Sequence, residues 1–277
     1  MLREVGWVEK RGEDSMYTNY ETLRVEKKKG ILWVYLNRPD KLNVFNMKML
    51  KELSDVMDKV EEDQEVKCVV ITGEGEKAFC AGADLGLLSK LDSQGALELS
   101  EIGQRLMKKI ESLRVPVIAA INGYALGGGF ELALACDFRI AAENIQLGNP
   151  EVKLGIIPGW GATQRLARII GLSRAMEFLM FGDRISASEA LDMGLVHKVV
   201  PQEKLREEVM SLAERIVEGP TIAQGLIKRV LIFGSQVPLD VGLELEKHAF
   251  STVFSTEDAK EGLRAFLSKR KPEFKGK

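Results

Sequence analysis

Two glutamates lie in stretches of sequence where a charged side chain is unusual, and both are close to glycines. Glu131 follows three consecutive glycines in "YALGGGFELALACD", and Glu151 lies twenty positions later in "LGNPEVKLGIIPGWG". A carboxylate among apolar residues is costly unless it is paired, hydrated in a cleft or protonated. Two such acids suit a reaction in which one accepts a proton from water and the other delivers a proton to carbon. The alternative is that each acid forms an ordinary salt bridge, for instance with Arg139, Lys153 or Arg165.

Two glycine-containing loops could supply the electrostatic half of such a site. "AFCAGADLG" and "YALGGGFEL" each follow an apolar strand and each offers small residues where a helix begins. The amides at a helix N-terminus are unsatisfied and carry partial positive charge, so one amide from each loop could hold an oxygen on which negative charge develops. The alternative interpretation is that these glycines only permit tight turns and close packing.

The elements around these loops alternate between strands and helices. Residues 22–39 predict two strands joined at Lys29-Gly30, and "CVVITG", "VPVIAAING", "FRIAA" and "IQLG" predict further strands. Apolar spacing predicts helices over 46–63 and 97–112 and a helix directly after the glycine run. This alternation indicates an α/β fold with mainly parallel pairing.

The composition changes near residue 200. From Leu205 onward the chain is charged and nearly strandless, and the pattern predicts four helices, over 205–218, 222–230, 239–254 and 256–268. We therefore divide the chain into a flexible extension over 1–15, a core over 16–200 and a helical region over 201–277. We expect the extension to be dispensable, with Met16 as a possible natural start.

Composition excludes several classes of protein. A formal charge of −2 over 277 residues favours neither nucleic acid nor an anionic membrane, and no apolar run is long enough for a membrane helix. The three cysteines are scattered, which predicts buried, reduced thiols. The motifs of P-loops, dinucleotide-binding folds, zinc proteases and nucleophile elbows are missing, and the chain has only two histidines, His197 and His248. We expect a cytoplasmic enzyme without a metal site.

From about Leu23 to Lys275 the sequence resembles the crotonase superfamily, specifically its enoyl-CoA hydratases. The segments that carry the resemblance follow one another along the chain: "LNRPDKLN", "AFCAGADL", "PVIAAINGYALGGGFELALACD", "PEVKLGIIPGWGATQRL", "GLVHKVVP" and "FSTEDAKEGLRAFLSKRKPEFKG". The resemblance implies a spiral core of ββα units followed by a C-terminal helical trimerisation region. It also implies a homo-oligomer, either a trimer or a hexamer built as a dimer of trimers.

The resemblance also implies roles for individual residues. The backbone N–H groups of Ala83 and Gly128 would form an oxyanion hole for the enolate of an acyl-CoA thioester. Glu131 would chiefly activate the water that adds to Cβ, and Glu151 would protonate Cα, so that water adds syn across a trans-2 double bond, reversibly. No cofactor is implied, because coenzyme A is part of the substrate. The residues expected to line the substrate and coenzyme A site are Lys41, Leu42, Ala81, Ala83, Asp84, Leu85, Gly86 and Gly128.

Other functions remain open at this point. An enoyl-CoA isomerase of the same fold usually retains only one of the two acids, so the pair Glu131 and Glu151 favours a hydratase. A non-catalytic or RNA-binding relative is disfavoured by the acid pair and by the charge of −2. A thioesterase would release free thiol. The bulky residues Phe130 and Trp160 leave the acyl-chain preference open.

Overall fold

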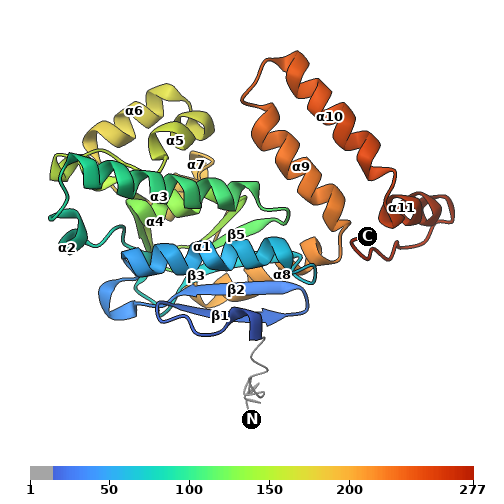
Figure 1. Ribbon diagram of the computed structural model, residues 1–277, viewed down its shortest axis with the longest axis horizontal. Helices are drawn as coiled ribbons and strands as arrows, with labels where there is room; N and C mark the ends of the chain where they lie inside the picture. The colour runs from blue at the N-terminus through green and yellow to red at the C-terminus, as the bar shows by residue number, and fades with distance from the viewer. Residues whose placement is uncertain (1–14) are drawn as a thin grey trace, which may run out of the picture.

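The computed structural model describes residues 15–277 and contains two sheets flanked by helices (Figure 1). The larger sheet has six strands in the order β1-β2-β3-β5-β7-β10, and all its pairs are parallel except β1 with β2. Its strands are β1 (Leu23–Lys28), β2 (Ile31–Leu36), β3 (Cys68–Gly73), β5 (Val117–Ile121), β7 (Phe138–Ala142) and β10 (Lys198–Val200).

The smaller sheet has four strands in the order β4-β6-β8-β9, of which the first three are parallel. These are β4 (Ala78–Cys80), β6 (Tyr124–Leu126), β8 (Gln146–Gly148) and β9 (Ile185–Ser186). Each successive turn of the chain adds one strand to each sheet and then a helix: β3, β4 and α3 (Ser93–Ser112), then β5, β6 and α4 (Gly128–Ala135), then β7, β8 and α5 (Ala162–Ile170). This is the spiral of ββα units that the resemblance to the crotonase superfamily implies.

Helix α1 (Met47–Glu62) shows why these residues fold as they do. Asn46 caps its first turn by accepting a hydrogen bond from the Met49 amide at 2.8 Å. The residues at helical spacing on one face are buried, and the opposite face is charged. The buried residues are Met49, Leu50, Leu53, Val56, Met57 and Val60.

The C-terminal region is helical, as predicted. It contains α8 (Leu205–Val217), α9 (Thr221–Gly234), α10 (Leu239–Val253) and α11 (Glu257–Leu267). Helix α8 packs on the larger sheet, whereas α9 and α10 pack on each other and extend away from the sheets (Figure 1). Buried Lys228 of α9 anchors this pair, since its ammonium lies 2.8 Å from Asp137 Oδ2 and donates to the carbonyls of Ile110 and Val115.

Other predictions differ from the structure in detail. Helix α3 begins four residues before the predicted position, α9 extends four residues further than predicted, and the short elements α2 (Leu85–Leu88), α6 (Leu172–Phe181) and α7 (Ala187–Asp192) were not predicted. All three cysteines are buried and free, as expected. The predicted extension lies outside the described residues except for Ser15. No helix among residues 15–277 is long and apolar enough to cross a membrane.

Candidate active site

The candidate site forms where three neighbouring parallel strands of the smaller sheet end. The loop after β4 carries Ala83, the loop after β6 carries Gly127 and Gly128, and the segment after β8 carries Glu151. Because the carboxyl ends of parallel strands lie at the same edge of a sheet, all three segments meet there. The predicted acids and the predicted oxyanion amides are therefore brought to one place by the order β4-β6-β8.

The two glycine loops approach each other closely. Gly82 has a φ of +106°, and a Cβ on it would lie 3.2 Å from the carbonyl oxygen of Leu126 and 3.8 Å from the amide nitrogen of Gly128. A side chain at Gly82 would therefore be strained and would push the loops apart. The backbone amides of Ala83 and Gly128 have no hydrogen-bond partner within residues 15–277. Two free N–H groups on adjacent loops are what an oxyanion hole requires.

The indole of Trp160 covers Gly128 from one side. A Cβ on Gly128 or on Gly103 of α3 would collide with this ring. Trp160 is buried, and its ring meets that of Phe45 edge-to-face with 5.3 Å between centroids. Trp160 therefore fills space next to the candidate oxyanion hole, and glycine is required at both facing positions.

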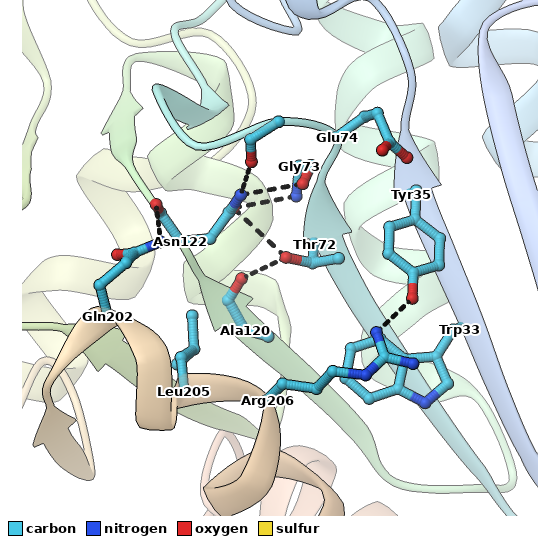
Figure 2. A pocket seen from close by; sticks show the side chains of 11 residues that line it. Trp33, Tyr35, Thr72, Gly73, Glu74, Ala120, Asn122, Gln202, Leu205 and Arg206 are labelled. Atoms are coloured by element: carbon cyan, nitrogen blue, oxygen red, sulfur yellow. Dashed lines mark hydrogen bonds between the residues drawn. The ribbon is translucent and has the colours of Figure 1, made fainter. Parts of the chain in front are cut away.

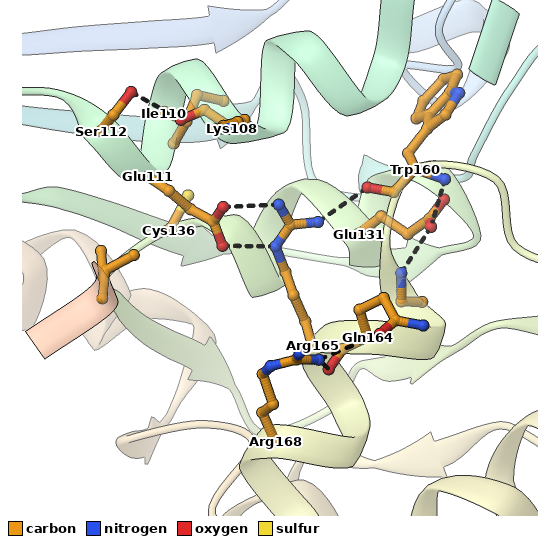
Figure 3. Close-up of polar contacts among 12 residues, drawn as sticks. Lys108, Ile110, Glu111, Ser112, Glu131, Cys136, Trp160, Gln164, Arg165 and Arg168 are labelled. Carbon is orange, nitrogen blue, oxygen red and sulfur yellow. Dashed lines mark hydrogen bonds and ion pairs between the residues drawn. The ribbon is translucent and has the colours of Figure 1, made fainter. Parts of the chain in front are cut away.

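Glu131 lies in the first turn of α4 with its carboxylate turned toward the segment before α5. Its Oε1 accepts hydrogen bonds from the backbone amides of Trp160 at 2.8 Å and Ala162 at 2.9 Å (Figure 3). Only 2% of the residue is exposed. Burial raises the pKa of Glu131 to about 7, the negative charge of Glu151 adds to the increase, and the two amides and Arg165 oppose it. A carboxyl group with a pKa near neutrality can both accept and return a proton.

Glu151 begins the turn η3 (Pro150–Leu154) and lies against the glycine loop. A Cβ on Gly127 would lie 3.2 Å from Glu151 Oε1. Asn149, which is fully buried, donates from Nδ2 to the same oxygen at 3.3 Å. Burial raises the pKa of Glu151, and the hydrogen bonds that it receives oppose the increase. The sequence marks Asn149 only by its place before Pro150 and Glu151, and its contact with the carboxylate was not predicted.

The salt-bridge alternative for the two acids is wrong. Arg139 donates to the carbonyls of Leu195, Ala133 and Cys136, so it holds the end of α4 instead. Lys153 lies 2.8 Å from Asp183, and Arg165 pairs with Glu111. Both candidate acids are left without an ion-pair partner among the described residues.

The residues expected to line the coenzyme A site are grouped along one rim. The amide of Ala81 donates to the carbonyl of Leu42 at 3.0 Å, which joins the Lys41–Leu42 segment to the loop after β4. Asp84 caps α2 by accepting from the Gly86 amide at 2.9 Å, and Leu85 is 60% exposed. A hollow of about 490 Å³ adjoins Leu42 and is bordered by Lys77.

The loop at Leu42 is rigidly held. Leu42 and Asn43 both adopt left-handed φ angles, 52° and 55°. Asn43 compensates by accepting from the Arg38 amide at 2.9 Å and donating to the carbonyls of Glu74 and Ala78. Strained backbone kept in place by buried hydrogen bonds is typical of binding loops.

A second hollow, of about 210 Å³, lies on the larger sheet and contains none of the predicted site residues (Figure 2). Trp33, Tyr35 and Arg206 form one wall, with the Arg206 guanidinium 4.7 Å from the Trp33 ring. On the other side Asn122 donates to the carbonyls of Gly73 and Gly75 and accepts from the Gly73 amide. These bonds fix the turn after β3. Neither Glu131 nor Glu151 lines this hollow.

The fold and the site together define the class of protein: a spiral of ββα units with two buried acids and two free amides at one sheet edge. The chain belongs to the enoyl-CoA hydratase/isomerase family, whose model matches residues 26–277. It is 45% identical to a crotonyl-CoA hydratase of Syntrophomonas wolfei over 92% of this chain and 98% of the relative. It is 42% identical to a short-chain-enoyl-CoA hydratase of Clostridium acetobutylicum over 90% of this chain and 95% of the relative.

Solved structures agree with this membership. An enoyl-CoA hydratase from Bacillus anthracis superposes with a TM-score of 0.89 and 44% identity, covering 93% of this chain and all of that one. An enoyl-CoA hydratase from Mycobacterium smegmatis, at 28% identity, has a TM-score of 0.87. The crotonase fold expected from the sequence is therefore confirmed.

Proposed function

We propose that this protein is a hydro-lyase that adds water across the trans-2 double bond of an enoyl-CoA to give a 3-hydroxyacyl-CoA, and also catalyses the reverse dehydration. The observation that carries the proposal is the convergence of Glu131 and Glu151 with the free amides of Ala83 and Gly128. The names of the relatives, crotonyl-CoA hydratase and short-chain-enoyl-CoA hydratase, support it. An isomerase is the second candidate, and the presence of both carboxylates argues against it.

In the proposed mechanism the substrate thioester oxygen binds between the amides of Ala83 and Gly128. These donors polarise the carbonyl, make Cβ electrophilic and stabilise the enolate oxygen as water adds. One such donor contributes roughly 2.7–4 kcal/mol in hydrolases. The two acids share one proton, and the reactive form carries it on Glu151: ionised Glu131 takes a proton from the attacking water while protonated Glu151 delivers its proton to Cα. After hydration Glu131 is protonated and Glu151 is ionised, so a proton returns from Glu131 to Glu151 by exchange through solvent before the next turnover. Dehydration runs the same steps in reverse, and the overall reaction transfers no electrons.

We place the coenzyme A part of the substrate along the rim formed by Lys41–Leu42 and the loop after β4. The exposed residues Lys41, Leu85 and Gly86 lie there, and Ala81, Ala83 and Asp84 are partly exposed. The hollow beside Leu42 adjoins this rim, but Asp40, Glu74 and Glu76 line it together with Lys77, so the placement rests on the exposed residues of the rim and not on the charge of the hollow.

We also propose a preference for short acyl chains. The acyl group would extend from the thioester toward the buried region beside Gly128, and the Trp160 ring fills part of that space. The names of the two relatives point the same way.

The proposed assembly is a trimer or a hexamer. Helices α9, α10 and α11 expose large apolar residues that a second copy could cover, and no residue of α10 is buried. The most exposed are Leu231, Leu239, Phe250, Phe266 and Leu267. A cytoplasmic location stays a prediction.

One assay separates the candidate activities. Purified protein is mixed with crotonyl-CoA, and the loss of conjugation and the release of free thiol are followed together. A hydratase removes the conjugated absorbance without releasing thiol, whereas a thioesterase releases thiol. An isomerase acts on a 3-enoyl-CoA and forms the conjugated product instead.

A further inference from the structure

Helix α3 holds the segment that binds the Glu131 carboxylate. The carbonyl of Gly159 accepts hydrogen bonds from Ser100 Oγ at 2.6 Å and from Gln104 Nε2 at 3.0 Å. Residues 159–162 supply both amides that bind Glu131. The position of the proposed base therefore depends on contacts made from α3.

One ion pair completes this support on the far side of the segment. Arg165 of α5 donates from Nε to Glu111 Oε1 at 2.6 Å and from Nη2 to Glu111 Oε2 at 2.8 Å (Figure 3). The third guanidinium nitrogen, Nη1, donates to the carbonyl of Trp160 at 2.9 Å. The side chains are only 15% and 25% exposed, so this bidentate pair is better shielded than surface pairs.

The Arg165 guanidinium packs closely against Gly161. Its φ is +116°, which disfavours any side chain, and a Cβ there would collide with Arg165 Nη1. Trp160, Gly161 and Ala162 are thus fixed between the guanidinium and the Glu131 carboxylate. The amides of Trp160 and Ala162 donate to Glu131, and the carbonyl of Trp160 accepts from Arg165.

We propose that Glu111 and Arg165 are positioning residues for the hydration reaction: they hold the 160–162 turn so that its amides aim the Glu131 carboxylate at the attacking water. This assignment rests on the proposed function. Neither residue belongs to the proposed substrate site. Both act through the turn, and Arg165 also acts through its charge.

The effect of charge can be tested separately, because among the described residues the charges that shift the pKa of Glu131 are those of Glu151 and Arg165. Glu151 approaches from η3 and Arg165 from α5, with Glu111 of α3 behind the guanidinium. Strand β4 brings Cys80, whose thiol stays neutral because burial raises its pKa to about 12. Strand β6 brings Tyr124, which is 39% exposed. Arg165 is thus the cation that lowers the pKa of Glu131, and Glu111 is the anion paired with it.

The test compares kcat, KM and the pH dependence of kcat/KM for crotonyl-CoA hydration in three variants of the full chain. Arg165→Met removes both the charge and the hydrogen bond to Trp160, so kcat should fall by up to about 100-fold. The pH below which kcat/KM falls, here called the acidic limb of the pH profile, should also move to a higher value. Arg165→Lys keeps the charge, so its limb should stay near that of the parent while kcat falls. Glu111→Gln leaves Arg165 unneutralised, so its limb should move to lower pH.

The matched control is Lys109→Gln, which breaks another inter-element ion pair of α3, with Asp58 at 2.7 Å. Melting temperatures of all variants report the structural cost of each change. Opposite displacements of the acidic limb in Arg165→Met and Glu111→Gln, with KM little changed, support the assignment. An active parent whose variants lose melting temperature but match Lys109→Gln in kcat and pH limb overturns the assignment alone. An inactive parent overturns the proposed function, and this assignment with it.

Discussion

Asn149 donates a hydrogen bond to one carboxylate oxygen of Glu151 at 3.3 Å, and the other oxygen, Oε2, is buried without a partner among residues 15–277. A buried carboxylate oxygen without a donor is unusual in a folded protein. It leaves one oxygen of Glu151 held by the protein and the other available to carry the proton for Cα. Glu131 contrasts with it, since its Oε1 receives two backbone amides.

The first prediction concerns the pH dependence of catalysis. Hydration requires ionised Glu131, whose pKa is about 7. The value of kcat/KM for crotonyl-CoA should therefore fall as pH decreases below about 7, because protonated Glu131 cannot accept a proton from water. Initial rates between pH 5 and 9 measure this limb. A rate that stays constant down to pH 5 would contradict the assignment of Glu131 as the base.

The second prediction concerns the stability of Glu131→Gln. The pKa of Glu131 is raised from 4.5 to about 7 in the fold, so the native state binds more protons than the unfolded state between these values. The stability contribution of this group is thus fully present below about pH 4.5 and is lost as pH rises through about 7. Glu131→Gln cannot titrate, so it does not lose this contribution as the pH rises. The difference between its free energy of unfolding and that of the parent should therefore shift in favour of the variant by up to about 3 kcal/mol between pH 4.5 and pH 8.

Urea unfolding of parent and variant at several pH values provides the measurement. The two curves of unfolding free energy against pH should diverge across this window and run parallel above it. Parallel curves from pH 4.5 to pH 8 would show that Glu131 is not buried with a raised pKa.

The third prediction concerns the candidate oxyanion hole. Gly128→Ala places a methyl group against the Trp160 ring, so the loop must shift and carry the Gly128 amide away from the substrate. We expect kcat to fall by roughly 10²–10³-fold, as for the loss of one oxyanion donor. Gly234→Ala of α9 is the control, because its new Cβ would meet no heavy atom closer than 3.7 Å. Removing the ring in Gly128→Ala/Trp160→Ala should recover part of the loss, and a double variant slower than Gly128→Ala would contradict the steric explanation.

The fourth prediction concerns assembly. The apolar side chains of α11 are largely uncovered, with Leu263 56% and Phe266 82% exposed. A chain that ends at Phe254 lacks α11, so it should form smaller species with low activity. Light scattering together with the hydration assay tests this. Unchanged mass and full activity after the truncation would show that α11 serves neither assembly nor the site.

Much of the fold follows from local pattern. The apolar spacing of α1 and the continuous apolar runs of β3 and β5 specify buried faces that only one kind of element can satisfy. Strands β4, β6 and β9 contain two or three residues, too few to show a period. The C-terminal helices are predicted by pattern, but the contacts that join α9 to the rest of the fold are not: buried Lys228 meets Asp137 and the carbonyls of Ile110 and Val115, which are distant in the sequence.

The candidate site, like the fold, contains residues that the sequence pattern indicates and residues that it does not. Glu131 and Glu151 stand out because an acid among apolar residues is costly, so composition alone points to them. The groups that position them do not stand out. Trp160 and Ala162 contribute backbone amides, which every residue has, and Arg165 meets Glu111 across 54 positions of sequence. Such contacts arise when α3 and α5 pack beside α4, and no local pattern predicts them.

The most direct test of the two-glutamate account is Glu151→Gln assayed with crotonyl-CoA in deuterated water. The substitution keeps the shape of the side chain and removes its transferable proton. The account predicts that the parent places deuterium at Cα of the 3-hydroxyacyl product, and that Glu151→Gln lowers kcat about 10²–10⁴-fold with KM little changed. Adding Glu131→Gln should slow it little further, because the two groups act in one step. Hydration by Glu151→Gln at nearly the parent rate would contradict the central claim.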